Sequence, residues 1–303
     1  MEKSGTAIEK RSQRRDFVKG VIVAAGYGTR LLPFTKTVPK ELIPLVDRPA
    51  ISFILDEFVD AGIEEVLIIG SRRKKSLEDF LDREVELEKV FHEEHRDQLA
   101  QMIKPPALRT TFVRQQQMNG TGHALLLAQS FAGNEPVIVA YPDDLFMGAG
   151  PNPSQQLVAV HQQTGGSVLA VLDMPGADVS RFGVVAPDDL GPPIKVKQLV
   201  EKPNPGTEPS RLVSLGRYVF TPELFSLLEH GLSHHQGGEY YHIHAINQLG
   251  ALGRLFAVPV VQTHLDVGDR LSYAQAFIRY ALSRSDLKEP LKALVADLLS
   301  SPQ

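Results

Sequence analysis

The stretch Val21-Ile-Val-Ala-Ala-Gly-Tyr-Gly-Thr-Arg-Leu-Leu-Pro33 decides the fold of this chain. Its apolar, β-branched start, Val21–Ala25, ends in a turn that contains Gly26 and Gly28 and is followed by Arg30. A buried parallel strand that ends in a glycine-rich turn is typical of phosphate binding, because glycines let the backbone approach the anion. The pattern therefore predicts a phosphate loop at the carboxyl end of the first strand.

Two common phosphate loops are excluded here. The chain contains no G-x-x-x-x-G-K-[ST], and Leu31 stands where G-x-G-x-x-G requires its third glycine. Lys40 follows Pro39, which fixes the local backbone, and adds a second positive charge to that of Arg30. An ordinary turn would need neither charge, so we expect Arg30 and Lys40 to neutralise a bound phosphate chain.

The longer stretch from Ala24 to Pro49, A-A-G-x-G-T-R-L-L-P-x-T-K-x-x-P-K-E-L-I-P-L-V-D-R-P, resembles the signature of the bacterial UTP–glucose-1-phosphate uridylyltransferases. These are sugar-phosphate nucleotidyltransferases with a Rossmann-like fold, and the resemblance extends from about Lys19 to about Tyr280. It implies transfer of a uridylyl group from UTP to glucose 1-phosphate, giving UDP-glucose and pyrophosphate. It also implies catalytic roles for Arg30, Lys40 and Lys202, and contact of the nucleotide with Ala24, Ala25, Gly26, Gly28 and Thr29.

A second motif, Val113–Ala124, has a glycine-containing loop that in the resembled family grips the base. Carried over, Gln115 binds the uracil edge and Gly120 lets the backbone meet it. An amide offers both a donor and an acceptor, which suits that edge. Taken alone, a glutamine-rich loop is more often polar surface, and we interpret His123 as a packing residue at a helix start.

Two aspartates that follow apolar runs are candidate metal ligands. Asp143 comes after Val137–Ala140, and Asp266 follows a later apolar run. Carboxylates at strand ends beside a phosphate loop suit a hard cation such as Mg²⁺, and the resemblance implies that these two hold it jointly. The alternative is a role in turns or helix capping, which fits Asp269 better than Asp266. We leave Asp144 and Asp269 as supporting residues.

The tripeptide Glu201-Lys202-Pro203 matches the family's sugar-phosphate motif. The resemblance implies that Glu201 accepts from sugar hydroxyls, that Lys202 contacts the phosphate, and that Gly183 leaves room for the sugar. Alone the tripeptide would be uninformative; its order after the other motifs gives it weight.

One segment departs from the family pattern. Where relatives usually show G-E-I-Q-L-T-D-A-I, this chain has Tyr241 in place of Gln and His244 in place of Asp. The sequence therefore does not determine which sugar and which base the protein accepts. Zinc is disfavoured, since His242 and His244 fall on opposite sides of a helix and no carboxylate stands at the required spacing.

Composition and charge narrow the class of protein further. The 303 residues carry a net charge of −4, so no global electrostatic footprint for nucleic acid exists. The absence of cysteine excludes disulfides, thiol catalysis and thiolate metal sites. Ser12–Lys19 resembles a twin-arginine export motif, but the apolar run behind it is shorter than the roughly 7–15 residues that export requires. We expect a cytoplasmic protein without a membrane span.

Strand-like runs alternate with helical patterns through the first half, which predicts an α/β, doubly wound and mostly parallel sheet. The resemblance implies that this sheet is Rossmann-like. We expect a polar N-terminal arm over 1–18, a catalytic domain over 19–284 with a β-rich sugar-side portion at about 180–220, and a C-terminal helical tail over 285–303. The apolar faces of the C-terminal helical region predict a homodimer or homotetramer.

Three alternatives remain open. The substrate could be another sugar 1-phosphate, or dTTP instead of UTP. The chain could be a catalytically silent homologue that senses a nucleotide sugar, although the retained charged residues argue against this. A Rossmann dehydrogenase is disfavoured by the missing third glycine.

Overall fold

The computed structural model describes residues 18–300, so nearly all of the predicted N-terminal arm lies outside the described residues. Its strands are β1 Lys19–Val23, β2 Pro44–Leu45, β3 Arg48–Pro49, β4 Glu65–Gly70, β5 Arg109–Arg114, β6 Val137–Ala140, β7 Asp144–Met147, β8 Ser167–Asp173, β9 Gly183–Asp189, β10 Ile194–Glu201, β11 Leu212–Phe220, β12 Leu255–Pro259 and β13 Thr263–Asp266. The α-helices are α1 Ala50–Asp60, α2 Lys75–Leu81, α3 Val85–Glu93, α4 Asp97–Met102, α5 Thr121–Leu126, α6 Gln129–Ala132, α7 Pro153–Thr164, α8 Glu223–Ser233, α9 Ile243–Ala251, α10 Arg270–Ser283 and α11 Lys288–Ser300.

Within the described residues, a nine-stranded sheet in the order β5-β4-β1-β6-β11-β8-β12-β10-β9 organises the molecule. Strands β1, β4, β5 and β6 pair in parallel, and so do β8 and β12. Strands β10 and β11 run against their neighbours, while all the others point the same way. The α/β class expected from the sequence is therefore confirmed, with a mixed sheet in which most strands share one direction.

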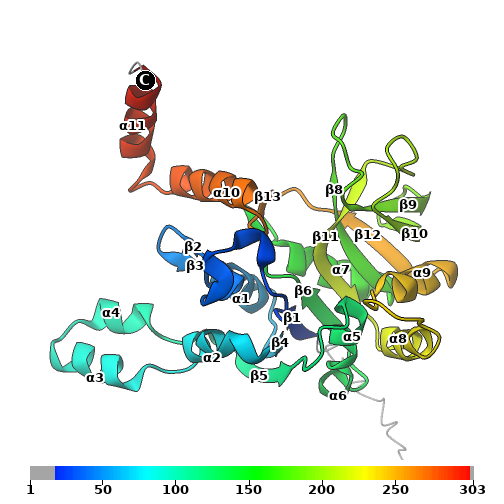
Figure 1. Cartoon of the computed structure of the whole chain (residues 1–303), viewed down its shortest axis with the longest axis horizontal. Helices are drawn as coiled ribbons and strands as arrows, with labels where there is room; N and C mark the ends of the chain where they lie inside the picture. Colours follow the sequence, from blue (N-terminus) through cyan, green and yellow to red (C-terminus); the bar gives the residue numbers. More distant parts are fainter. Residues whose placement is uncertain (1–17, 301–303) are drawn as a thin grey trace, which may run out of the picture.

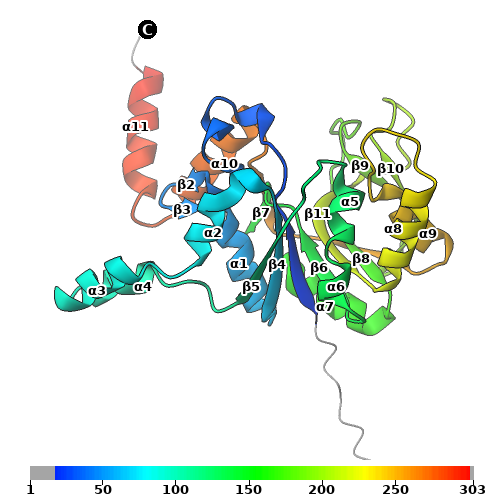
Figure 2. The same ribbon diagram turned by 60° about the horizontal axis from the view of Figure 1, so that its bottom comes forward.

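Alternating side chains of the central strands build two separate cores, one on each face. Ile22 and Ile68 pack on one face with apolar residues of α1 and α7, and Val21 and Leu67 pack on the other with residues of α5 and α8. Strands buried on both faces explain why β1 and β4 are continuously apolar. Figures 1 and 2 show these helices covering opposite sides of the sheet.

The β-rich stretch of the sequence supplies β9, β10 and β11 to the same sheet. Strands β9 and β10 form its edge, whereas β11 lies near its centre between β6 and β8. The small pair β7–β13 joins the segment after β6 to the segment before α10. These pairings bring both candidate metal aspartates to one end of the sheet.

Two helical parts lie away from the sheet. Figures 1 and 2 show α3 and α4 projecting together from the body, and α11 following α10 at the C-terminal end. Asp269 is the N-cap of helix α10, and its side chain accepts from the backbone N–H groups of Leu271 and Ser272, as its interpretation as a capping residue requires. Within residues 18–300, the helices are all too short or too polar to cross a bilayer.

Candidate active site

The phosphate loop leaves β1 in a conformation that only glycine adopts easily. Gly28 has φ +68°, and its carbonyl accepts a 2.7 Å hydrogen bond from Thr35 Oγ1. A Cβ at this position would lie 3.0 Å from the Thr35 side chain. The short 3-10 helix Thr29–Leu31 follows directly and carries Arg30 toward the end of the sheet.

Both predicted cations of the loop meet Asp143. Lys40 Nζ lies 2.7 Å from Asp143 Oδ2, and Arg30 Nη2 lies 3.6 Å from the same oxygen. Burial alone would raise the pKa of the Asp143 carboxyl, but Lys40 and, to a smaller extent, Arg30 bring it below its usual value. Asp143 is therefore a charged carboxylate beside the phosphate loop at neutral pH.

Asp266 reaches the same point from a different strand. An ideal Cβ on Gly268 would lie 3.0 Å from Asp266 Oδ1, 3.1 Å from Asp143 Oδ2 and 3.1 Å from Arg30 Nη2. The three side chains thus surround one small volume, and Gly268 leaves it open. Its N–H donates to Asp266 Oδ1 at 2.7 Å and fixes that carboxylate.

This pair of carboxylates fits a divalent cation. Burial raises the pKa of Asp266, and the negative charges of Asp144 and Asp143 raise it further, so a cation there would relieve the repulsion. Among residues 18–300, no group of three or more His, Asp or Glu side chains is arranged to hold a metal. Proteins nevertheless often bind Mg²⁺ through only two carboxylates, because waters and substrate phosphates provide its other ligands.

Asp144 supports the site through a histidine that sequence reasoning missed. His264 Nε2 lies 2.6 Å from Asp144 Oδ1, and the two belong to the paired strands β13 and β7. Burial opposes the charged imidazole, but the bond to Asp144 raises the pKa of His264 overall. Only the pairing of strands far apart in the chain makes this contact, so no local signal in the sequence indicated it.

Beneath these groups lies a second ion pair, between Arg217 and Glu57. Arg217 Nε and Nη2 each donate to a Glu57 carboxylate oxygen at 3.0 Å, and the arginine is fully buried. Glu57 Oε1 also accepts from the Ser154 backbone N–H at 3.1 Å, and Arg217 Nη1 donates to the Gly216 carbonyl at 3.1 Å. The pair links α1, β11 and the start of α7 directly behind the site.

The predicted base loop is folded around Gln115. This side chain is buried, and its Nε2 lies 3.1 Å from both the Gly120 carbonyl and His123 Nδ1. The amide nitrogen therefore braces the loop. His123 belongs to this bracing contact rather than to the cluster of charged residues around Asp143.

Gly120 is needed for a close approach between two segments. It has φ +90°, and a Cβ on it would lie only 2.5 Å from the Tyr240 carbonyl oxygen. Tyr240 N donates to the Asn119 carbonyl and Gly122 N donates to the Tyr240 carbonyl, both at 2.8 Å. Backbone hydrogen bonds thus join the predicted base loop to the segment that departs from the family pattern.

The predicted sugar residues meet at the β9–β10 pair. Gly183 lies opposite Glu201 in the register, and a Cβ on Gly183 would be 3.1 Å from Glu201 Oε2. Lys202 has φ +47°, and its exposed side chain lies 3.8 Å from Glu201 Oε1. A cavity of about 290 Å³ opens here, lined by Asp143, Gly183, Glu201, Tyr218, Tyr241 and His242 among others.

The divergent segment places its aromatic residues in different surroundings. Tyr240 is buried and donates through its hydroxyl to the Leu228 carbonyl at 2.8 Å. Tyr241 and His242 line the cavity. His244 is exposed on α9, close to Gly231 of α8 and away from that cavity. Sequence reasoning singled out His244, whereas His242 is the histidine beside the sugar residues.

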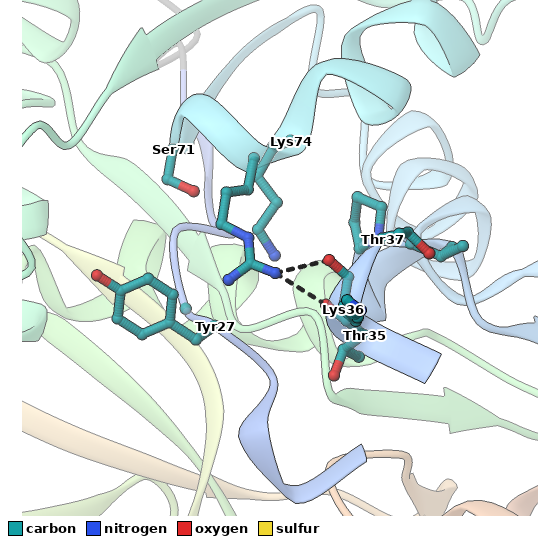
Figure 3. Close-up of a pocket in the computed structure, with 10 residues that line it drawn as sticks. Tyr27, Thr35, Lys36, Thr37, Ser71 and Lys74 are labelled. Carbon is teal, nitrogen blue, oxygen red and sulfur yellow. Dashed lines mark hydrogen bonds between the residues drawn. The ribbon is translucent and has the colours of Figure 1, made fainter. Parts of the chain in front are cut away.

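A second cavity, of about 220 Å³, is lined in part by Gly26 and Tyr27 of the phosphate loop. Arg73 Nη2 donates to the Lys36 carbonyl at 2.8 Å and more weakly to that of Thr35 at 3.4 Å (Figure 3). Lys74 Nζ forms a buried 2.7 Å ion pair with Glu41, and burial lowers the pKa of this lysine despite that partner. These cations hold the loop in place through contacts within the protein.

The sequence matches known proteins over most of its length. The nucleotidyl transferase family model matches residues 19–282. The UTP–glucose-1-phosphate uridylyltransferase of Staphylococcus epidermidis is 37% identical over 92% of this chain and 98% of its own length, and that of Bacillus subtilis is 36% identical over 94% and 98%.

Solved structures agree with these relatives. A UTP-bound UGPase from Acinetobacter baumannii superposes with a TM-score of 0.84 and 32% identity, covering 93% of this chain and 99% of its own. A UDP-glucose pyrophosphorylase complexed with UDP-glucose gives a TM-score of 0.77 and 33% identity, covering 88% and 100%. The chain described here therefore belongs to the nucleotidyl transferase family.

Proposed function

We propose that this chain transfers a uridylyl group from UTP to glucose 1-phosphate and releases pyrophosphate. The observation that carries the proposal is the convergence of Arg30, Asp143 and Asp266 on one open volume, beside a cavity lined by Gly183 and Glu201. The first group of residues suits a polyphosphate and its cation, and the second suits a sugar. The names of the relatives, UTP–glucose-1-phosphate uridylyltransferase, support the same pair of substrates.

The reaction needs no covalent enzyme intermediate. A phosphate oxygen of glucose 1-phosphate attacks the α-phosphorus of UTP in line, the bond between the α-phosphorus and its bridging oxygen breaks, and pyrophosphate leaves with the electron pair. The chain's contribution is then positioning and charge neutralisation. In this proposal Arg30 and Lys40 neutralise the triphosphate, and Lys202 binds the phosphate of the sugar.

The base and the sugar are held on either side of that centre. Gln115 accepts from the uracil edge through its amide oxygen, since its nitrogen already braces the loop. Gly120 allows the backbone to meet the base, and Ala24 to Thr29 line the path of the nucleotide. Glu201 accepts from sugar hydroxyls beside Gly183.

Asp143 and Asp266 would hold the divalent cation, which we propose to be Mg²⁺. Bound there, the ion would stabilise the charge that develops on the phosphates. Both carboxylates are at strand ends and held by contacts from Lys40 or Gly268, so the chain presents them in fixed positions.

Pyrophosphate release, measured over a matrix of nucleoside triphosphates and sugar 1-phosphates with Mg²⁺, tests the proposal. We expect the highest kcat/KM with UTP and glucose 1-phosphate. A preference for dTTP or for another sugar 1-phosphate would show that the protein carries out the same reaction on a different substrate. No release with any pair, together with tight binding of UDP-glucose, would identify a silent homologue instead. A cytoplasmic location and a homodimer or homotetramer stay predictions.

A further inference from the structure

The wall of the sugar cavity contains a buried imidazole with one nitrogen left over. His242 is 7% exposed and lines the cavity together with Gly183 and Glu201. Its Nδ1 lies 2.7 Å from Thr121 Oγ1, whereas its Nε2 is buried and has no hydrogen-bond partner among residues 18–300. A buried polar atom without a partner is energetically unfavourable, so such atoms usually have a ligand or a water to bind.

The ring is held in a fixed orientation. It stacks on Tyr141 with ring centroids 5.9 Å apart and planes 26° apart, and it meets Tyr218 edge to face at 5.7 Å and 78°. Thr121 fixes the remaining rotation from the start of α5. Because the side chain is already positioned, binding a ligand would require little further ordering.

The imidazole is neutral in this environment. Burial lowers the pKa of His242 to about 4, so near neutral pH one ring nitrogen is a donor and the other an acceptor. Which of these roles Nε2 has depends on the direction of the bond between Nδ1 and Thr121. A hydroxyl group can satisfy Nε2 in either case, because it both donates and accepts.

We propose that His242 determines sugar specificity by binding one hydroxyl group of the sugar through Nε2. The inference rests on the proposed function, since it assigns the occupant of the cavity to the sugar of a sugar 1-phosphate. The wall also carries three carboxylates, those of Asp143, Asp144 and Glu201, which favour hydroxyl donors over a second anion. In the segment that the resembled family usually shows, a leucine stands at this position, and a leucine could not make this contact.

Two variants separate the ring nitrogens. In His242→Asn the side chain reaches about as far as Nδ1 and keeps a partner for Thr121, but it has nothing at the position of Nε2. In His242→Gln the amide reaches about as far as Nε2 and restores a polar group at its position. Thermal unfolding of both variants checks that the fold is retained.

The experiment measures kcat/KM for glucose 1-phosphate and for its 2-, 3-, 4- and 6-deoxy analogues, with UTP saturating. The wild-type protein should discriminate against one deoxy analogue by tenfold or more, because a site that binds a hydroxyl rejects the analogue that lacks it. His242→Asn should lose about tenfold on glucose 1-phosphate and no longer discriminate at that one carbon. His242→Gln should recover part of both effects, and KM for UTP should change less than twofold in each variant.

Other outcomes overturn the inference in distinguishable ways. If His242→Asn lowers kcat/KM for all analogues by the same factor, or weakens UTP equally, Nε2 binds no sugar hydroxyl and the residue is structural. If the wild-type protein uses no sugar 1-phosphate at all, the proposed function fails and the inference fails with it. If the wild-type protein turns over normally and His242→Asn discriminates among the deoxy analogues as the wild type does, the inference fails while the proposed function stands.

Discussion

Two ion pairs lie close together in this molecule and have very different surroundings. In the Arg217–Glu57 pair, two parallel 3.0 Å bonds join the charges, and Ser154 and the Gly216 carbonyl satisfy further atoms. In the Lys40–Asp143 pair, one 2.7 Å bond joins the charges, and the carboxylate faces a cavity. The first pair is almost closed to solvent, since Arg217 is fully buried and Glu57 is 7% exposed at the wall of a separate cavity, whereas the second is open to a ligand.

The difference separates an ion pair with a structural role from one that can take part in the reaction. A buried charge pair whose hydrogen-bonding capacity is used within the protein can only hold elements together. A pair with capacity left over, next to another carboxylate and an arginine, can exchange its partners for those of a substrate. We therefore expect the Arg217–Glu57 pair to determine stability and the Lys40–Asp143 pair to determine turnover.

Breaking the closed pair should give the largest effect. Arg217→Met leaves Glu57 charged and buried without its partner, and should lower the free energy of unfolding by about 3–5 kcal/mol in a urea titration. Combining it with Glu57→Gln removes the orphaned charge and should restore a large part of that loss. A decrease below about 1 kcal/mol for the single variant would show that the pair is not needed by the fold.

Breaking the open pair should affect turnover instead. Asp143→Asn removes a carboxylate from the proposed cation site, where charge stabilisation is worth several kcal/mol, so kcat should fall by about 100-fold or more. Far-UV circular dichroism should stay unchanged. Asp269→Asn is the matched control, because asparagine caps a helix about as well as aspartate, and it should leave turnover near normal. Near-normal turnover of Asp143→Asn with Mg²⁺ would contradict the assignment.

The exposed cation beside Glu201, Lys202, should affect one substrate only. Lys202→Ala removes a charge-assisted contact to the sugar phosphate and should raise KM for glucose 1-phosphate about tenfold, while KM for UTP changes less than twofold. Lys197→Ala, at an exposed position of strand β10, which ends just before Lys202, should change neither value. Equal weakening of both substrates by Lys202→Ala would place this lysine elsewhere in the reaction.

The smallest effect should come from the cap of α10, which lies outside both pairs. Asp269→Ala removes the acceptor for two backbone N–H groups and should lower stability by about 1 kcal/mol. Hydrogen bonds from Ser272 and Leu271 hold the pKa of Asp269 below its ordinary value of 3.8. The stabilisation is therefore complete above that value and is lost as the pH falls through the lower, folded-state pKa. A stability difference between wild type and variant that does not decrease as the solution is acidified would contradict this account.

Much of this arrangement could be predicted from the sequence. The apolar run before Gly26 and the strand–helix alternation are local patterns, and they gave the α/β class and the end of the sheet where ligands bind. Family motifs then indicated Asp143, Asp266, Gly183 and Glu201, which the structure brings to one region.

The rest depended on contacts between distant segments. No local pattern inserts β11 between β6 and β8, and only that insertion places Arg217 against Glu57. The same holds for His264, which meets Asp144 only because β13 pairs with β7. His242 carried no signal of its own, since whether a lone histidine points to a cavity or to solvent depends on its tertiary neighbours.

The close approach of Gly120 to Tyr240 has a consequence for redesign of the protein. Backbone bonds join residues 119–122 to residue 240, and no space exists there even for a methyl group. The two loops therefore move as one unit, although one is expected to bind the base and the other the sugar. A redesign that inserts or exchanges residues in one loop to change its specificity would have to replace the other loop as well.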